Sequence, residues 1–368
     1  MKRPILLYLH SIQGGGAERF FLTLANGLSP DLFEVHVVLG SDHIKDYEAK
    51  FSASIKLHYL YSKASKKSLI KLAKLIRQIR PQLAFTTINK NNLTLLAASI
   101  LSCHQMPIVV REANHLSKTE YSSRKVRFLT RWLYNLKASQ IVAVSNGVKD
   151  DLVNHYKIKK AKISIIYTPI DLEKIHQLGQ YNPYDDEQPN RIVHVGSFTS
   201  QKDHRTLLEA FALVLKDMQA HLTLVGDGPL KSSILEDIKL HNLIKNVTLT
   251  GFVQNPFGYV YHSDLFVLSS KYEGFPNVLL EAMALHTPIV STDCPSGPNE
   301  IIDDGVNGLL VPVESKERLA KAMLTLLKNA DQRVKYADSA YEKVQSFSLS
   351  SQLKAYETLF LSRMDEKL

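Results

Sequence analysis

The chain has 368 residues, of which 45% are hydrophobic and 22% are charged, the composition of an ordinary globular protein. At about 100–200 residues per domain, this length predicts two domains. No segment approaches the ~18 consecutive apolar residues of a membrane-spanning helix, and the apolar run at residues 5–9 is too short for a signal peptide. Cys103 and Cys294 form no CxxC pair, so we expect inert thiols in a reduced, cytoplasmic protein.

The net charge of +9 is divided unevenly along the chain. Residues 1–185 hold 27 Lys and Arg against 13 Asp and Glu, a charge of +14, and the remainder carries −5. A basic N-terminal half predicts an anionic partner such as nucleic acid, a phospholipid surface or a phosphorylated substrate. Solvated lysines that only keep the protein soluble are the alternative.

Strands and helices alternate from the start of the chain. The apolar run at residues 5–9 precedes three glycines and a helical pattern over residues 17–28. Further strand-like runs occur at residues 35–39, 83–87, 108–111, 141–145 and 163–167. This βαβ series predicts a parallel sheet covered by helices.

The alternation breaks near Pro169 and starts again at residue 191. The polar stretch 180–190 is predicted to be an interdomain linker, and its acidic run 185–187 is interpreted as solvated rather than metal-binding. Strands of the second series are predicted at residues 191–195, 222–225, 247–250, 265–269, 288–292 and 308–311. The sequence therefore predicts an α/β protein with two doubly wound, Rossmann-like domains, 1–170 and 171–345, facing each other across a cleft that holds the active site.

Gly14, Gly15 and Gly16 lie between a strand and a helix, where backbone N–H groups can approach an anion. The spacing does not match the dinucleotide motif G-x-G-x-x-G, because Arg19 stands at the sixth position counted from Gly14. The chain also has no GxxxxGK[ST] phosphate loop. We expect a phosphate or sugar contact here, and a purely steric turn is the alternative.

The stretch YEGFPNVLLE at residues 272–281 places two carboxylates eight positions apart. A helix is predicted from Phe275 to about residue 285, with Pro276 in its first turn. Glu273 then stands at the helix mouth, and Glu281 lies about two turns along at ~1.5 Å per residue. This spacing fits an elongated ligand of sugar, diphosphate and ribose, because a carboxylate binds vicinal ribose hydroxyls. An amphipathic helix with incidental acids is the alternative.

The flanks of this stretch carry a family resemblance. The segment SSKYEGFPNVLLEAMA at residues 269–284 resembles the E-x7-E signature of retaining glycosyltransferases of family 4, which have the two-domain GT-B fold. Segments similar to other motifs of that family lie at residues 14–19, 225–230, 251–252, 288–293, 297–302 and 305–312. The resemblance covers essentially the whole chain.

The resemblance implies roles for individual residues. Catalytic roles are implied for three of them: His115 and Glu273 contact the transferred sugar, and Lys202 holds the diphosphate, which gains negative charge as it leaves. Glu281 is implied to bind the ribose. The other donor-binding positions that the resemblance implies are Gly15, Gly16, Gly196, Phe252, Val253, Gly274, Phe275, Asn277 and Val278.

Two positions depart from the family pattern. The family usually has Gly-Arg before the lysine segment, whereas this chain has Gly196-Ser197. A second basic contact to the diphosphate is therefore open, with Arg205 and Arg191 as substitutes between which the sequence does not decide. His286 stands where glycine is usual, and we interpret it as a tolerated turn.

The activity implied is transfer of a hexose or N-acetylhexosamine from a UDP-linked nucleotide sugar to a lipid-linked sugar acceptor, in polysaccharide or glycan biosynthesis. Residues 1–170 are implied to bind the acceptor and 171–345 the nucleotide sugar, with a helix over 346–368 crossing back to the N-terminal domain. The chain has no DxD motif, and such enzymes are generally metal-independent. We therefore expect no metal and no cofactor, with cationic side chains and helix dipoles in place of an ion.

Two basic segments lie in the N-terminal half. Lys67, Lys71 and Lys74 form one stripe of a predicted helix over residues 63–80, and residues 124–137 mix Arg and Lys with Phe128, Trp132 and Tyr134. Basic amphipathic helices with aromatics lie on anionic membranes. We therefore expect a polyprenyl-diphosphate-linked acceptor and a peripheral location at the inner face of the membrane. The alternative is that the apolar faces pack on the sheet and the lysines are only solvated.

Other classes of protein fit less well. A nucleotide-sugar epimerase of the same architecture has no need of an acceptor, and the E-x7-E signature speaks against it. A nucleic-acid-binding protein is compatible with the basic charge, but no RRM, helix-turn-helix or zinc signature is present, so we expect no nucleic-acid partner. A two-lobed sugar-binding module has no use for a catalytic histidine, and the predicted site is shaped for a nucleotide rather than for a retaining glycosidase.

Overall fold

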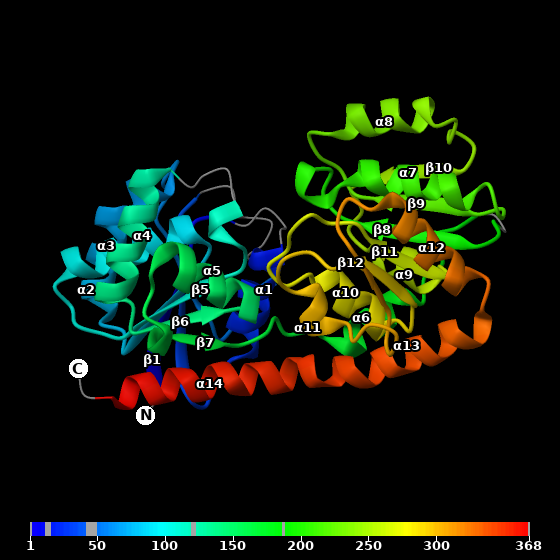
Figure 1. The fold of residues 1–368 in the computed structure, drawn as a ribbon. Coiled ribbons are helices and arrows are strands. Elements are labelled where there is room, and N and C mark those ends of the chain that lie inside the picture. The colour runs from blue at the N-terminus through cyan, green and yellow to red at the C-terminus, as the bar shows by residue number, and fades with distance from the viewer. Residues whose placement is uncertain (1, 12–15, 42–49, 119–122, 186–187, 367–368) are drawn as a thin grey trace. The chain divides into compact units, whose positions relative to one another are not determined.

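The computed structural model describes residues 2–11, 16–41, 50–118, 123–185 and 188–366. The chain divides into two compact units (Figure 1), and each is described by itself. Unit 1 comprises Met1–Pro169 and Ser350–Leu368, and unit 2 comprises Ile170–Leu349.

Unit 1 is built on a parallel seven-stranded sheet in the order β3-β2-β1-β4-β5-β6-β7. Its strands are β1 (Arg3–Leu9), β2 (Phe33–Leu39), β3 (Lys56–Tyr59), β4 (Leu83–Thr87), β5 (Ile108–Glu112), β6 (Gln140–Ala143) and β7 (Ile163–Ile165). Residues 5–9 of β1 are fully buried, because the sheet is covered on both faces. Strand β3 at the sheet edge is absent from the sequence prediction.

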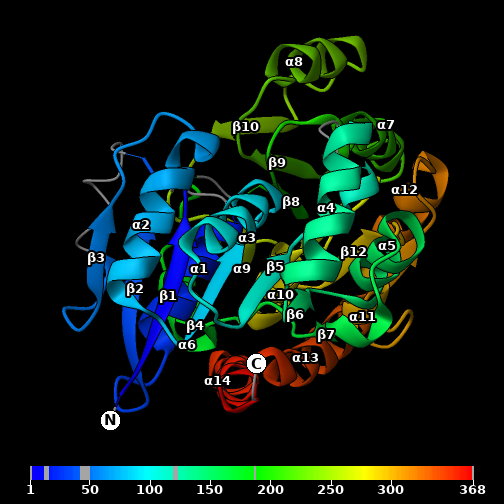
Figure 2. The same ribbon diagram turned by 90° about the vertical axis from the view of Figure 1, so that its left-hand side faces the viewer.

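The helices of unit 1 connect these strands and cover them. They are α1 (Gly16–Gly27), α2 (Leu69–Ile79), α3 (Asn89–Ser102), α4 (Arg124–Lys137), α5 (Asn146–Tyr156) and α14 (Leu349–Asp365). Figure 2 shows α3 between α2 and α4. Helix α14 supplies Tyr356 and Phe360 to the core that contains Phe20 of α1 and Phe85 of β4, so residues far apart in sequence complete this unit.

Unit 2 repeats the plan with a parallel six-stranded sheet in the order β10-β9-β8-β11-β12-β13. Its strands are β8 (Arg191–Val195), β9 (His221–Val225), β10 (Val247–Gly251), β11 (Leu265–Leu268), β12 (Ile289–Thr292) and β13 (Leu309–Val311). Its helices are α6 (Leu172–Gly179), α7 (His204–Val214), α8 (Lys231–Leu240), α9 (Phe257–Tyr261), α10 (Asn277–Ala284), α11 (Pro298–Ile301), α12 (Lys316–Leu327) and α13 (Ala330–Val344).

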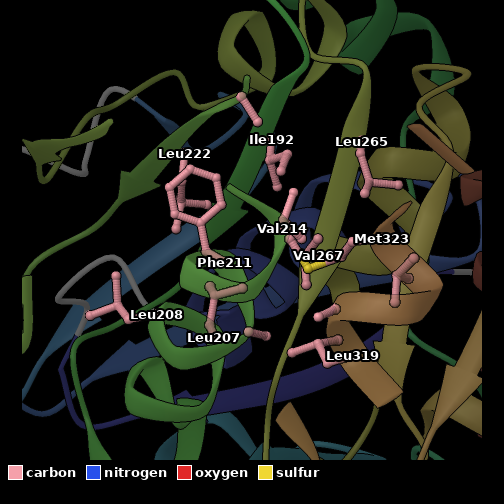
Figure 3. Close-up of a cluster of buried hydrophobic side chains, with 14 of the residues drawn as sticks. Ile192, Leu207, Leu208, Phe211, Val214, Leu222, Leu265, Val267, Leu319 and Met323 are labelled. Carbon is pink, nitrogen blue, oxygen red and sulfur yellow. The ribbon is translucent and has the colours of Figure 1, made fainter. Parts of the chain in front are cut away.

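The core of unit 2 lies between its sheet and the helices α7 and α12. Figure 3 shows the apolar side chains that meet there, among them Leu207, Phe211, Val214, Leu222, Val267, Leu319 and Met323. Helix α7 repeats its apolar residues at intervals of three and four, which buries one face against the sheet. This packing fixes the position of the turn that leads into α7.

The predicted linker at residues 180–190 is wrong. The boundary between the units falls at Pro169–Ile170, and residues 170–185 belong to unit 2. The Tyr184 hydroxyl donates to the backbone carbonyl of Tyr259 at 3.2 Å and lies 2.9 Å from the Ser263 hydroxyl. The stretch is polar in composition but is packed on unit 2 through this aromatic residue. The acidic run at 185–187 lies partly outside the described residues.

Both sheets reverse their strand order at an internal point. The reversal falls between β1 and β4 in unit 1 and between β8 and β11 in unit 2. Loops after the carboxyl ends of such strands are where open α/β sheets bind ligands. A ligand site in unit 2 is therefore expected at the loops that follow β8 and β11.

Candidate active site

A lysine follows strand β8 at the switch point of unit 2. The chain leaves β8 at Gly196, forms a 3-10 turn at Ser200–Lys202 and enters α7. Gly196 lies so close to Lys202 that a Cβ at this position would be 3.4 Å from Cδ and Cε of the lysine. The Lys202 side chain is only 14% exposed, so its charge is largely removed from water.

A carboxylate follows strand β11 and meets this lysine. Lys202 Nζ donates to Glu273 Oε1 at 2.5 Å. Ser270 Oγ donates to the same oxygen at 2.6 Å, and Gln201 Nε2 donates to Oε2 at 3.2 Å. The Glu273 side chain is 7% exposed, so a buried charge is matched by a counter-charge and two further donors.

The two loops are also joined through their backbones. Lys271 N donates to Gln201 O at 2.8 Å, and Ser269 Oγ donates to Lys202 O at 2.7 Å. Gln201 Nε2 also donates to Tyr272 O at 2.9 Å. The turn after β8 and the loop after β11 therefore form one rigid polar structure.

The end of β12 and the loop after it also hold the loop after β11. Thr292 Oγ1, at the end of β12, donates to Ser270 O at 2.6 Å, and Ser296 Oγ, in the loop, donates to Gly274 O at 2.8 Å. Gly297 has a φ of +91°, and a Cβ there would meet Pro276 Cδ at 2.5 Å, so this position requires glycine. Cys294 in the same loop is buried. Its burial raises the pKa of its thiol well above the usual value, and the negative charge of the nearby Glu273 raises it further.

Helix α10 begins at Asn277, with Pro276 at the capping position rather than in the first turn. Glu281 is therefore about one turn along the helix, not two as the sequence predicts, at ~1.5 Å per residue. The Glu281 side chain is buried within the helix packing. Asn277 Oδ1 at the first turn is buried and has no hydrogen-bond partner among the described residues.

The remaining predicted donor residues lie around these loops. Phe275 is buried, with its ring 5.6 Å from that of Phe347, so it packs in the structure of unit 2. Val278 is half-buried on the first turn of α10. Phe252 follows β10 and its side chain is 73% exposed, whereas Val253 is half-buried.

Two buried histidines lie beneath the lysine. His194 of β8 donates from Nδ1 to Val267 O at 2.9 Å, and its ring lies 4.8 Å from that of His204. Burial lowers the pKa of His194 to about 4 and that of His204 to about 2, with the charge of Lys202 acting in the same direction. Both rings are therefore neutral at physiological pH, so Lys202 has no second positive charge from these histidines near it.

His115 is the predicted site residue of unit 1, in the loop after β5. Its Nδ1 lies 3.6 Å from Asp151 Oδ1 of α5, and its Nε2 is buried without a hydrogen-bond partner in the described residues. Gly16, also in unit 1, is the exposed first residue of α1, and Gly15 lies outside the described residues.

A buried polar cluster stands next to His115, at the end of β5. Glu112 Oε1 accepts hydrogen bonds from Asn92 Nδ2 at 2.9 Å, from Asn89 Nδ2 at 3.2 Å and from the Tyr134 hydroxyl. Burial raises the pKa of Glu112 to about 7, against the lowering effect of these donors and of Arg111. The sequence prediction places Tyr134 among surface aromatics, which is wrong, because the ring is fully buried in this cluster.

The predicted lysine stripe is divided among several contacts. Lys67 is exposed in the 3-10 turn Ser65–Ser68, before α2 begins. Lys71 Nζ donates to the carbonyls of Leu60 at 2.7 Å and Tyr61 at 3.3 Å, so it also ties α2 to the end of β3. Lys71 and Lys74 line a cavity of about 300 Å³ together with His58, Tyr59, Leu60, Tyr61, Leu75 and Gln78.

Helix α4 presents an exposed apolar stripe. Phe128 is 72% exposed, and Leu129, Trp132 and Leu136 are also exposed, so large side chains repeat at intervals of four on the outer face. The exposed cations Arg124, Lys125, Arg127, Arg131 and Lys137 lie among them. The opposite face buries Thr130, Leu133 and Tyr134. No helix in the described part of the chain is long and apolar enough to cross a membrane.

The structure brings several residues into the site that the sequence analysis does not assign. Gln201 and Ser270 hold Glu273, and Asp151 lies against His115. Of the predicted residues, the contacts join Lys202 directly to Glu273 and place Gly196 beside the lysine. Among the described residues, no group of three or more His, Cys, Asp or Glu side chains is placed to hold a metal ion.

Solved structures share this fold. An Anabaena protein crystallised with UDP and glucose superposes with a TM-score of 0.84 at 20% identity, over 98% of this chain and 100% of that one. Sucrose-phosphate synthase from Thermosynechococcus elongatus gives a TM-score of 0.80 at 18% identity, over 98% and 100% of the two chains. The two parallel α/β sheets therefore define a protein of the GT-B class.

The sequence relatives narrow this class. Residues 14–174 match the model described as Glycosyltransferase Family 4, and residues 189–329 match Glycosyl transferases group 1. A Campylobacter jejuni enzyme, N-acetylgalactosamine-N,N'-diacetylbacillosaminyl-diphospho-undecaprenol 4-alpha-N-acetylgalactosaminyltransferase, is 32% identical over 93% of this chain and 94% of its own. An amylovoran biosynthesis glycosyltransferase from Erwinia amylovora is 26% identical over 94% and 95%. The chain belongs to glycosyltransferase family 4.

Proposed function

We propose that the protein transfers a hexose or N-acetylhexosamine from a UDP-linked sugar to a sugar acceptor carried on a lipid diphosphate, with retention at the anomeric carbon. The observation that carries this proposal is the buried Lys202–Glu273 pair. It stands after the adjacent parallel strands β8 and β11, where the strand order reverses. Family membership, the lipid-diphosphate substrate named for the Campylobacter relative and the UDP bound by the Anabaena protein support the same reading.

The pair has a simple part in the reaction. Without a donor, Glu273 neutralises Lys202. A bound diphosphate offers the ammonium a partner of higher charge, and Glu273 can then accept hydrogen bonds from hydroxyls of the transferred sugar. When the bond from the anomeric carbon to the diphosphate breaks, negative charge grows on the leaving oxygen and Lys202 stabilises it.

The remaining donor contacts are assigned around this pair. The N-terminus of α10 adds positive potential for the diphosphate. Asn277 Oδ1, buried and without a partner in the described structure, is able to accept a hydrogen bond from the donor there. Glu281 binds the ribose hydroxyls, and the ring of Phe252, which is exposed, stacks on the base.

His115 of unit 1 contacts the transferred sugar. Its Nε2 is buried and has no hydrogen-bond partner in the described structure, so a sugar hydroxyl can satisfy it without competition. Cationic side chains and the helix N-terminus supply positive charge, and the proposal includes no metal.

An acceptor at the membrane is the finer part of the proposal. Helix α4 combines exposed Phe128 and Trp132 with five exposed cations, as helices that lie in an anionic membrane surface do. Lys71 and Lys74 line a concave surface, which can hold the charged part of the acceptor where it leaves the bilayer. Both features belong to unit 1, whose excess of basic residues favours an anionic partner.

The test is mass spectrometry of the products formed from a panel of nucleotide sugars and lipid-linked acceptors, with and without EDTA. We expect one added hexose or N-acetylhexosamine on the acceptor, from a UDP-linked donor, in both conditions. Conversion of the donor to an isomer without any acceptor would instead establish an epimerase. Activity lost with EDTA and restored by a divalent cation would overturn the metal-free mechanism.

A further inference from the structure

The contacts of His115 are organised by one residue of helix α5. Asp151 has a buried side chain that is 1% exposed, and it stands opposite the loop that carries His115. Its Oδ2 accepts a hydrogen bond from the backbone N–H of Ser117 at 3.2 Å. One carboxylate oxygen therefore fixes the backbone of the His115 loop.

The other oxygen faces two imidazole rings. Asp151 Oδ1 lies 3.6 Å from Nδ1 of His115 and 3.1 Å from Nδ1 of His155, which is one turn further along α5 and largely exposed. The first distance is longer than a hydrogen bond, and Oδ1 makes no hydrogen bond within the described residues. Catalytic hydrogen bonds are often long in structures without substrate and shorten when it binds.

The charge on Asp151 is held in place by these contacts. Burial alone raises the pKa of this carboxyl, but the approach of His115 and the hydrogen bond from Ser117 outweigh it and hold the pKa below its usual value. The group is therefore a carboxylate at neutral pH, which can accept hydrogen bonds but cannot donate one.

A carboxylate facing Nδ1 decides how the ring is protonated. In a neutral imidazole one nitrogen carries the proton, and the hydrogen bond at one nitrogen sets the state of the other. With the proton on Nδ1, toward Asp151, the buried and unpartnered Nε2 of His115 has a free lone pair. Such a nitrogen accepts a hydrogen bond from a hydroxyl.

We infer that Asp151 is a positioning residue for the transfer reaction, which holds His115 in the Nδ1–H tautomer so that Nε2 accepts a hydrogen bond from a sugar hydroxyl. The inference rests on the proposed contact between His115 and the transferred sugar. It goes beyond that contact in assigning the direction of the hydrogen bond and the residue that enforces it. Removing the partner that orients a metal-bound histidine changes activity by about 10- to 100-fold, and we expect a loss of the same order here.

The first arm of the test is NMR of the ligand-free full chain, with imidazole ¹⁵N shifts measured at neutral pH. We expect His115 in the Nδ1–H tautomer in the wild type, a mixture or the Nε2–H tautomer in Asp151→Asn, and the Nδ1–H tautomer in Asp151→Glu. Asp150→Asn removes the exposed neighbouring acid of the same helix and should leave the tautomer unchanged. An Nε2–H tautomer in the wild type overturns the inference, even if Asp151→Asn fails to fold.

The second arm is kinetics with the donor and acceptor found by mass spectrometry. Asp151→Asn should lower kcat by about 10- to 100-fold with little change in the KM for the donor, and Asp151→Glu should recover part of the loss. If Asp151→Asn keeps the wild-type tautomer and kcat while its melting temperature falls, the residue is only structural and the inference is wrong. A wild type with the expected tautomer but no transferase activity would overturn the proposed function instead, so the two failures are distinguishable.

Discussion

Lys202 and Glu273, 71 positions apart, meet in a hydrogen bond of 2.5 Å that is largely shielded from water. The lysine lies in the turn after β8, and the glutamate lies in the loop after the neighbouring strand β11. Ser270 and Gln201 complete the carboxylate's hydrogen bonds. The arrangement holds two opposite charges ready at the end of the sheet, so one contact serves both the stability of unit 2 and the proposed chemistry.

Replacing Lys202 with methionine should destabilise unit 2, because Glu273 is then buried without its counter-charge. Breaking one partner of a buried pair costs about 3–5 kcal/mol, and the two remaining donors should keep the loss near the lower value. The measurement is unfolding in urea, monitored by hydrogen exchange of the backbone amides of β8 and β11. Lys328→Met is the matched control, since its 3.9 Å pair with Asp217 is exposed and such pairs contribute about 0–1 kcal/mol. Equal losses in the two variants would contradict the account.

Glu281→Ala should weaken the binding of UDP more than it changes the product. The carboxylate is proposed to accept hydrogen bonds from two ribose hydroxyls, and each bond to a charged group contributes about 1.5–3 kcal/mol. At least a tenfold rise in Kd is therefore expected. Calorimetry with UDP alone decides this, with the exposed Glu317→Ala of α12 as the control. An unchanged affinity would remove Glu281 from the ribose.

Stability should depend on pH through Glu112. Its pKa is raised to about 7 by burial, from 4.5 for the exposed group. The folded state then binds the proton more tightly than the unfolded state, so the stabilisation is complete below about pH 4.5 and is lost as the pH rises to about 7. Glu112→Gln, which remains neutral, should lack this loss of about 3 kcal/mol.

The single tryptophan, Trp132, lies in unit 1 and makes this measurement direct. Urea unfolding followed by its fluorescence at pH 5, 6, 7 and 8 gives the difference between the wild type and Glu112→Gln. We expect the wild type to lose stability relative to Glu112→Gln as the pH rises from 5 to 7, and the difference in the free energy of unfolding to level off above pH 7. Parallel pH profiles for the two proteins would contradict this prediction, because they would mean that ionising Glu112 in the folded state does not lower the free energy of unfolding.

Membrane binding should depend on both basic segments of unit 1. Replacing Lys67, Lys71 and Lys74 with Gln should lower co-sedimentation with anionic liposomes by roughly a hundredfold, at about 1 kcal/mol for each lysine near the surface. The effect should fade at high salt, because charges are screened beyond ~10 Å at 0.1 M. Lys71 also holds the carbonyls of Leu60 and Tyr61, so Lys67→Gln/Lys74→Gln is needed as a variant that leaves this tie intact.

Variants of the exposed apolar stripe of α4 distinguish binding to a bilayer from binding to a soluble acceptor. Phe128→Ser/Trp132→Ser should lower binding to anionic liposomes, since both side chains are proposed to enter the membrane surface. Transfer to a short, water-soluble acceptor analogue should be nearly unaffected. If the wild type and both sets of variants bind anionic vesicles equally, or none binds, the two segments are merely solvated faces.

Most of the fold follows from local patterns in the sequence. The strands of a parallel sheet are buried on both faces, so runs rich in apolar residues such as 83–87 (LAFTT) and 191–195 (RIVHV) mark strands β4 and β8 to the residue. The sequence does not predict strand β3, because KLHY is short, lies at the sheet edge and mixes polar with apolar residues. The polar composition of residues 180–190 predicts a linker, whereas the packing of this stretch depends on Tyr184.

The site was predictable only in part, for a physical reason. The E-x7-E segment marks Glu273 and Glu281, but nothing local in sequence tells that Lys202 meets Glu273 across the sheet. Ser270 and Gln201 carry common polar groups whose role appears only once the strands are paired. Asp151 and His155 look like an ordinary i,i+4 pair on a helix surface, and only the fold brings His115 to the same carboxylate.

The proposed transfer with retention is tested most directly by the anomeric configuration of the product. Proton NMR of the glycan formed from an α-linked UDP-sugar reads this configuration from the coupling at the anomeric carbon. We predict an α-linked product from the wild type, and a slower reaction giving the same linkage from Glu281→Ala. A β-linked product would contradict retention, and free sugar or an isomerised donor in the presence of a competent acceptor would contradict the transferase itself.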